Sequence, residues 1–386
     1  MSFGAGNGQN PVHVNSIWAV LDRRVAEGRI PGYVAAVRCR GASEVHASGH
    51  AAFGPDAAPM APDTLFRIAS LSKPLAAALT LALVDGGLLS LDDEIRRWLP
   101  EFARPAVLRR FDGPLDDTVP AARPITVADL LTSTAGWGLL LDASDLQAAV
   151  DDRQLGPGPV PPPMTGDEYV RRLAELPLAF QPGTGWLYDM PIKVLSVLLD
   201  RVTDQSLGEL LAERITGPLG MADTGFRARS PGRLATQYAP TTDGGLAVFD
   251  RPDGVFAQPP AFEDLSCGLV STAPDLLRFF SALADGGDPV LRPESVRLMT
   301  ADHLTEDQRR QGQDILGDGH SWGLGAAVAV ESAQPWMVPG RWGWIGGTGT
   351  SAHVQPDGGV AIFLSQRMLA DAQEGFDDFW AAFAQV

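Results

Sequence analysis

Apolar residues recur at helical spacing near both ends of this 386-residue chain. Residues 14–28 predict an amphipathic helix with Asn15 as a candidate N-cap, and its apolar face carries Ile17, Val20, Leu21 and Val25. Residues 374–385 predict a last helix, and its apolar face carries Phe376, Phe379, Trp380 and Phe383. Each end of the chain thus supplies one amphipathic helix.

Segments typical of strands also lie near both ends. Residues 32–40 and 43–49 predict two strands separated by the turn residues Gly41 and Ala42. Residues 349–355 and 359–365 flank a Pro-Asp-Gly-Gly turn, which is a strong hairpin signal.

The middle of the chain predicts mainly helices. Residues 71–85 are almost entirely apolar and end at Gly86-Gly87. Short helices are expected at 126–131, where Thr126 and Asp129 have capping-box spacing, and after Ser206 for the same reason. Residues 271–287 predict a helix with an early proline and a glycine stop. Residues 104–125 predict irregular structure, and residues 155–166 predict a loop.

One more helix is expected after Pro191. Its inward positions are Leu195, Leu198, Leu199 and Val202, and its outward positions are Lys193, Ser196 and Asp200. The simplest architecture is one α/β domain built from both termini (residues 8–75 plus 205–386), with a mainly helical domain (residues 76–204) inserted between its parts. The active site is then expected in the cleft between the two domains.

The amino-acid composition excludes several kinds of function for this protein. The net charge of −17 argues against nucleic acid and anionic membranes as partners, and solubility is the simplest reason for it. Residues 1–15 contain no signal-peptide pattern, and the two cysteines, Cys39 and Cys267, form no disulfide framework. We therefore expect a cytoplasmic protein, with Cys267 a buried small residue. The six histidines include no metal-binding pair, so we expect no metal and no cofactor.

Lysine usage singles out one position. Of the 30 lysines and arginines, only Lys73 and Lys193 are lysines. Lys73 follows Ser70 by three positions at the start of the apolar helix, so the amine can reach the hydroxyl. A serine becomes a good nucleophile when a neighbouring base takes its proton. Lysine can be that base if burial and the positive helix end lower its pKa, whereas arginine stays protonated.

This Ser-x-x-Lys motif is short enough to occur by chance. The alternative is that Lys73 is a solvated residue in the first turn of a helix. The helix that follows it is apolar nearly all round, which favours a lysine that is buried or faces a cleft.

The sequence around the Ser-x-x-Lys motif resembles that of a known family. Residues 63–102 (DTLFRIASLSKPLAAALTLALVDGGLLSLDDEIRRWLPEF) are similar to the first signature block of the serine β-lactamase and penicillin-binding protein superfamily. ITVADLLTSTAGWG, LAFQPGTGWLYDMPIKVLSVLLDRVTDQSLGELLAERITGPLGMADTGF, CGLVSTAPDLLRFFSALADGG and GWIGGTGTSAHVQPDGGVAIFLSQR resemble the later blocks, in the right order. The resemblance is greatest to the class C β-lactamase-like branch, which includes the family VIII carboxylesterases.

The resemblance implies a fold and a set of roles. The fold would be α+β and β-lactamase/transpeptidase-like, an antiparallel sheet flanked by helices with the helical insertion described above. Ser70 would be the nucleophile, Lys73 its activating partner and Tyr188 a proton relay. The third motif of the family falls on Trp344-Ile345-Gly346, and the N–H groups of Ser70 and Gly347 would form the oxyanion hole.

Two departures from the family pattern bear on the substrate. Met190 stands where the family has asparagine, and Trp344 replaces the basic residue of the third motif. We expect both to make the cleft apolar and to favour a neutral ester over a β-lactam carboxylate, although Arg341 could still supply a cation. Trp137, Trp322, Trp336 and Trp342 could line the pocket beside Trp344, but core packing is the simpler expectation for each of those four.

The leading hypothesis is therefore a serine carboxylesterase acting on short-chain esters through an acyl-enzyme. Its predicted substrate-binding residues are Trp344, Ile345, Gly346, Met190 and Trp137. A β-lactamase, a D-amino-acid amidase or peptidase, and an acyltransferase remain open, because all three would use the same Ser-Lys-Tyr site. A non-catalytic binding protein is disfavoured, since Ser70, Lys73 and Tyr188 are all present. The expected partner is a small ester or amide.

Overall fold

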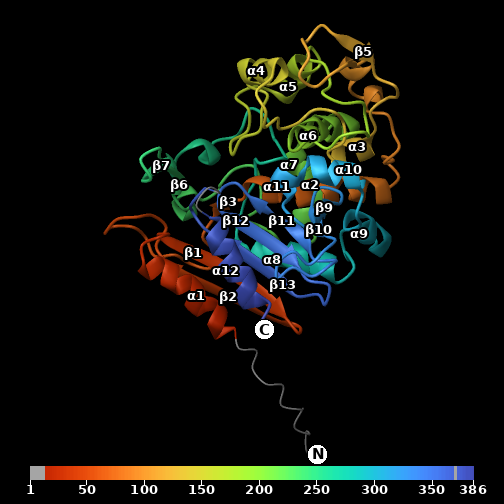
Figure 1. Cartoon of the computed structure of the whole chain (residues 1–386). Helices are drawn as coiled ribbons and strands as arrows, with labels where there is room; N and C mark the ends of the chain where they lie inside the picture. Colours follow the sequence, from red (N-terminus) through yellow and green to blue (C-terminus); the bar gives the residue numbers. More distant parts are fainter. Residues whose placement is uncertain (1–13, 369–371) are drawn as a thin grey trace, which may run out of the picture.

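A seven-stranded antiparallel sheet joins strands from the two ends of the chain (Figure 1). The structure, a computed structural model, describes residues 14–368 and 372–386. The sheet order is β2-β1-β13-β12-β11-β10-β9. In that order the strands are Ala42–Gly49, Gly32–Cys39, Val360–Leu364, Thr350–Val354, Trp342–Gly346, Ala327–Ala329 and His320–Trp322. The predicted strands at both ends are confirmed, as is the hairpin at residues 356–359.

Alternating residues of this sheet are buried against different helices, as the two-residue period of a strand requires. Tyr33, Ala35 and Val37 belong to a core with α1 (Asn15–Ala26) and α12 (Gln373–Phe383). Val34 and Ala36 point to the other face, which α8 (Ala273–Ala284) covers. The sheet is therefore a middle layer between helices.

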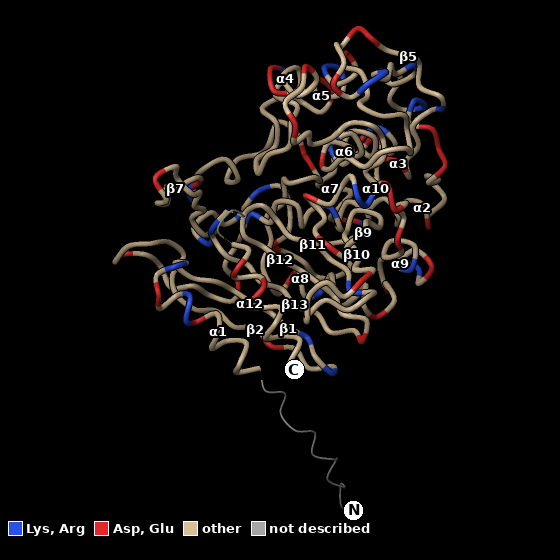
Figure 2. Tube along the Cα trace, in the orientation of Figure 1, with Lys and Arg blue, Asp and Glu red and all other residues tan. Residues whose placement is uncertain are grey.

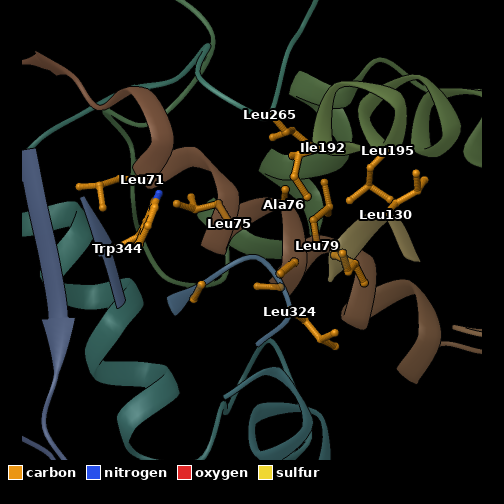
Figure 3. Close-up of a cluster of buried hydrophobic side chains, with 14 of the residues drawn as sticks. Leu71, Leu75, Ala76, Leu79, Leu130, Ile192, Leu195, Leu265, Leu324 and Trp344 are labelled. Atoms are coloured by element: carbon orange, nitrogen blue, oxygen red, sulfur yellow. The ribbon is translucent and has the colours of Figure 1, made fainter. Parts of the chain in front are cut away.

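Helix α2 (Ser72–Asp85) lies at the centre of the larger core. Its residues are buried from Ser72 to Leu83, which explains why the sequence shows no polar face. Figure 3 shows Ala76 and Leu79 of α2 near Ile192 and Leu195 of α6 (Met190–Thr203), with Leu71 near Trp344 of β11. The helix thus connects the sheet to the helical half of the molecule.

The remaining elements are short. The helices are α3 (Val127–Leu131), α4 (Asp145–Asp152), α5 (Gly166–Leu173), α7 (Leu207–Leu211), α9 (Pro293–Met299), α10 (Glu306–Gln311) and α11 (Gln313–Leu316). Three two-stranded ladders pair β3 (Phe66–Arg67) with β8 (Val270–Ser271), β4 (Ala106–Leu108) with β5 (Thr118–Pro120), and β6 (Gln237–Pro240) with β7 (Leu246–Asp250). The division at residues 76 and 204 stays a prediction, and residues 8–13 of it lie outside the described residues.

Most of the predicted helix starts are confirmed. Thr126 and Asp129 form the expected capping box, and the Ser206 hydroxyl accepts the Glu209 N–H. The prediction of irregular structure at 104–125 is incomplete, because β4 and β5 pair there. Asn15 is not the N-cap of α1: Val14 occupies that position, and no side chain caps the helix.

The outward face assigned to α6 is wrong at two of its three positions. Lys193 and Ser196 are fully buried, and only Asp200 is exposed. The first two turns of α6 pack against α2, α3 and α5, so polar side chains there point into the protein. The Lys193 ammonium must therefore be paired with acidic groups inside the protein.

Acidic and basic positions are interspersed over both halves of the molecule (Figure 2). No helix among the described residues is both long and apolar enough to span a membrane.

Candidate active site

Ser70 lies in a tight turn between strand β3 and helix α2. The turn is a short 3₁₀ helix, η1 (Ala69–Leu71), and Ala69 has a φ of 43°. This left-handed conformation is unfavourable for alanine and is often found where a backbone is held for function. The turn leaves Ser70 half-buried, at the wall of a cavity of about 430 Å³.

Lys73 is fully buried one helical turn after Ser70. Its Nζ donates to Ser70 Oγ (2.9 Å), to Asp189 Oδ1 (2.7 Å) and to the Ser266 carbonyl (2.8 Å). An ammonium group has three N–H donors and no lone pair, so three acceptors match its charged form. The structure thus brings the predicted nucleophile and its lysine together.

The electrostatics of Lys73 differ from the sequence expectation. Burial alone would lower the pKa of Lys73, but the Asp189 carboxylate at 2.7 Å raises it above its usual value. The sequence-based expectation that the pKa of Lys73 is lowered is therefore wrong, because that expectation did not include the Asp189 carboxylate. Lys73 is held as an ammonium ion around neutral pH.

Asp189 sits in a strained turn that aims its side chain at Lys73. Its φ is 80° and its ψ is −64°, and the Met190 N–H donates to the Tyr188 carbonyl across it. This is a γ-turn of the rare, strained kind. The turn places the Tyr188 ring and the Asp189 carboxylate on the same lysine.

A second buried lysine continues the charge network. Lys193 Nζ lies 2.7 Å from Asp264 Oδ2 and 3.4 Å from Asp189 Oδ2, and it also donates to Ser266 Oγ (2.8 Å). Charges alternate along the chain of contacts Lys73, Asp189, Lys193 and Asp264, so the network is neutral overall. Buried charges are tolerated when they are paired and hydrogen-bonded in this way.

Tyr188 is held in an aromatic cluster. Its phenol oxygen accepts the Trp344 indole N–H at 2.6 Å, and Trp186 and Trp322 pack against its ring at centroid distances of 5.9 Å. The Lys73 Nζ lies 4.4 Å from the centre of the Tyr188 ring. The ring is therefore fixed beside the lysine that contacts Ser70.

The predicted oxyanion hole also faces this cavity. Ser70 and Gly347 both line it. Ser70 lies in the first turn of η1, where backbone N–H groups have no partner within the helix. The Gly347 N–H forms no hydrogen bond with another described residue.

Gly346 explains how strand β11 comes so close to the nucleophile turn. A side chain at Gly346 would collide with the Ile68 carbonyl oxygen and with the Thr350 hydroxyl. Because glycine has no Cβ, β11 can pack against the backbone that leads into Ser70. The Thr350 hydroxyl then donates to the Ile68 carbonyl at 3.1 Å.

Several predicted binding residues lie away from this cavity. Met190 and Trp137 are packed in the hydrophobic core, where the Trp137 ring lies tilted against Phe102 with centroids 4.6 Å apart. Trp344, Ile345 and Arg341 line a separate cavity, so Arg341 does not supply a cation beside Ser70. Met190, which stands where the family has asparagine, therefore packs in the core. Its neighbour Asp189 is the residue that contacts Lys73.

The walls of the Ser70 cavity carry little charge. Beside Ser70, Tyr188, Asp189 and Gly347 they consist of Ala69, Pro157, Gly158, Pro159, Ala239, Pro240 and Met368. Asp189 is already paired with lysines. No group of three or more potential metal ligands occurs among the described residues. A larger hollow of about 640 Å³ beside α7 holds none of the residues of this site.

Comparison with known proteins agrees with this geometry. A model of the Beta-lactamase family matches residues 18–385. The chain belongs to that family. Protein Rv1367c of Mycobacterium tuberculosis is 40% identical over 325 residues, covering 80% of this chain and 79% of the relative. Esterase EstB of Burkholderia gladioli is 33% identical over 387 residues, covering 92% of this chain and 91% of EstB.

A solved structure extends the comparison to three dimensions. EstCE1, described as a hydrolase with promiscuous acyltransferase activity, superposes with a TM-score of 0.82 at 25% identity and covers 96% of this chain and 98% of its own. The fold is thus the predicted α+β, β-lactamase/transpeptidase-like one. This Beta-lactamase family member is a serine hydrolase.

Sequence reasoning missed the charge network and most of the aromatic cluster. Asp189 lies next to Tyr188, and Asp264 and Ser266 lie far along the chain, with no motif to mark them. Lys193 did carry a signal: it is the other lysine of a chain that otherwise uses arginine.

Proposed function

We propose that this protein is a carboxylesterase that hydrolyses short-chain esters through an acyl-enzyme on Ser70. One observation carries the proposal: the cavity beside Ser70 is lined mainly by proline, alanine, glycine and methionine, and its one carboxylate is already paired. Such walls suit a neutral substrate. A cavity of about 430 Å³ fits a small ester.

In the first step, Ser70 Oγ attacks the ester carbonyl carbon, and negative charge moves to the carbonyl oxygen. The Ser70 and Gly347 N–H groups would donate to this oxyanion. Such donors stabilise the transition state more than the substrate, and the loss of one typically costs about 3–4 kcal/mol.

The proton of Ser70 needs an acceptor. Lys73, with its three N–H groups donated, has no lone pair to offer. We assign the role to Tyr188, whose phenol oxygen accepts the Trp344 N–H and whose ring centre lies 4.4 Å from the Lys73 ammonium. Tyr188 then returns the proton to the departing alkoxide, and the alcohol leaves.

Deacylation repeats the same chemistry with water. Tyr188 takes a proton from the water that attacks the acyl carbon, and it returns this proton to Ser70 Oγ as the acid leaves. If an alcohol replaced that water, the product would be a new ester. The described acyltransferase activity of EstCE1 makes acyl transfer the second candidate function.

A substrate panel tests the proposal. We expect p-nitrophenyl acetate and butyrate to be hydrolysed faster than nitrocefin or a D-amino-acid anilide, and we expect Ser70→Ala to lose at least 10³-fold in kcat/KM. Adding an alcohol acceptor measures acyl transfer in the same assay. Faster turnover of nitrocefin than of every ester would refute the esterase assignment, and undiminished turnover by Ser70→Ala would refute the nucleophile.

A further inference from the structure

A second cavity, of about 470 Å³, lies between α12, α11 and the β9–β11 end of the sheet. It shares no lining residue with the cavity at Ser70. Its walls carry three tryptophans, Trp336, Trp344 and Trp380, and the rings of Trp336 and Trp380 lie 4.6 Å apart. Its walls also carry charged and polar side chains, and aromatic walls with polar groups placed among them are a common form of small-molecule site.

The unusual group in this cavity is Arg341. Its side chain is 2% exposed, and its Cζ lies 4.7 Å from the ring centre of Trp336 and 4.7 Å from that of Trp380. Its Nη2 is buried without a hydrogen-bond partner, and no carboxylate within the described ranges forms an ion pair with it. The other buried guanidinium with similar exposure, Arg67, pairs with Asp250.

An unpaired buried cation is costly. Burial lowers the pKa of Arg341 to about 9, and no acidic group raises it again. Contacts with two indole faces offset part of this cost. They do not replace the hydrogen bonds of a guanidinium, which has five donors in a planar fork suited to a carboxylate.

Other polar groups of the cavity also have hydrogen-bonding capacity that a bound molecule could use. His320 Nδ1 is also buried and unpartnered, and His353 lies against Trp380 with centroids 4.8 Å apart. Burial and the nearby Arg341 lower the pKa of both histidines, so both are neutral at pH 7. They can therefore form hydrogen bonds without adding charge to the cavity. Asp314, Asp318 and Asp377 also line the cavity, and this acidity disfavours anions of more than one charge.

We propose that this cavity binds a small organic monocarboxylate. The carboxylate would accept from the Arg341 guanidinium, and the apolar body would lie against Trp336, Trp380 and Met337. A neutral analogue would leave the guanidinium unpaired, and a dianion would be repelled by the three aspartates. The site goes beyond the proposed esterase activity, and binding to it requires no turnover at Ser70.

Benzoate is a suitable probe, and benzamide is its neutral counterpart of the same shape. We would follow tryptophan fluorescence and thermal unfolding of the wild type with benzoate, benzamide and inorganic phosphate. We expect saturable binding of one benzoate per chain with a rise in Tm, and at least tenfold weaker binding of benzamide and phosphate. Equal effects of benzoate and benzamide, or no effect of benzoate, would overturn the proposal.

Arg341→Met supplies the matched variant. We expect it to lose benzoate binding at least tenfold while its KM for p-nitrophenyl acetate stays within twofold, which separates this cavity from that at Ser70. The unliganded variant should also unfold at an equal or higher Tm, because a buried unpaired charge has been removed. If Arg341 only packs against the tryptophans, the Tm falls and benzoate binding is unchanged, and the proposal fails. Should this variant not fold, Arg341→Lys is expected to weaken benzoate binding while keeping the charge, and unchanged affinity would count against the site.

Discussion

The carboxylate of Asp189 lies 2.7 Å from the Lys73 ammonium and 3.4 Å from the Lys193 ammonium. One acid therefore connects the lysine that contacts Ser70 to a second lysine deeper in the core. Because Asp189 raises the pKa of Lys73, it decides which protonation state of the lysine is present when the substrate arrives. The following predictions test this relationship and the contacts around it.

Asp189→Asn should narrow the pH range of activity. Burial would then lower the pKa of Lys73 without the opposing effect of this carboxylate, so the ammonium form would be lost at a lower pH than in the wild type. We expect the alkaline limb of kcat/KM, measured with p-nitrophenyl acetate between pH 5 and 10, to move to lower pH. The exposed Asp200→Asn on the same helix is the control. Higher activity of Asp189→Asn than of wild type at pH 7 would instead identify a neutral Lys73 amine as the base.

Lys193→Met should destabilise the protein by about 3–5 kcal/mol, because Asp264 and Asp189 lose a buried partner. The double variant Lys193→Met/Asp264→Asn should recover part of this loss, since Asp189 keeps Lys73 as a partner and the negative charge left uncompensated at Asp264 is also removed. Chemical denaturation of the wild type, both single variants and the double variant measures the coupling. Strictly additive effects would show that the pair is not energetically linked.

Trp344→Phe should lower kcat by roughly 10–100-fold with little change in KM, because the Tyr188 oxygen loses the indole N–H donor that holds it in place. Trp342→Phe is the matched control: this residue lies on the same strand and packs against Phe280 at 5.5 Å. Single-turnover rates of the two variants give the comparison. Equal losses in both would mean that Trp344 acts only through packing.

Stability should fall between pH 6.5 and pH 4 because of His320, in addition to the buried His353, whose pKa is lowered in the same direction. Burial, followed by the charge of Arg341, lowers the pKa of His320 to about 4, whereas in the unfolded chain it is near 6.5. Below pH 6.5 the unfolded chain therefore takes up a proton that the folded protein does not, which favours unfolding by up to about 3 kcal/mol at pH 4.

His320→Gln should flatten this dependence in urea denaturation at a series of pH values. The partly exposed His303→Gln serves as the control. If the slopes of wild type and His320→Gln coincide, the histidine does not carry the effect.

The sequence was informative wherever a pattern is local. Spacing alone predicted that the Ser70 hydroxyl and the Lys73 amine would meet, and their contact is 2.9 Å. Capping residues and the Asp357-Gly358 turn likewise act over a few positions, so the helix starts and the last hairpin could be placed.

Contacts between distant segments could not be predicted in this way. Asp189 and Lys73 are 116 positions apart, and Lys193 and Asp264 are 71 apart. Helical periodicity also assigns a polar residue to the outer face, which misplaced Lys193 because a buried ion pair breaks that rule. The roles of Tyr188 and Gly347 in catalysis stay predictions that rest on the family resemblance.

The burial of both lysines has a practical consequence for labelling. With Lys73 and Lys193 fully enclosed, the folded chain offers no side-chain amine to solvent. Succinimidyl esters, aldehyde fixatives and lysine-directed cross-linkers should therefore leave every lysine of the native protein unmodified. Incorporation of such a reagent at either position would report local opening of the core.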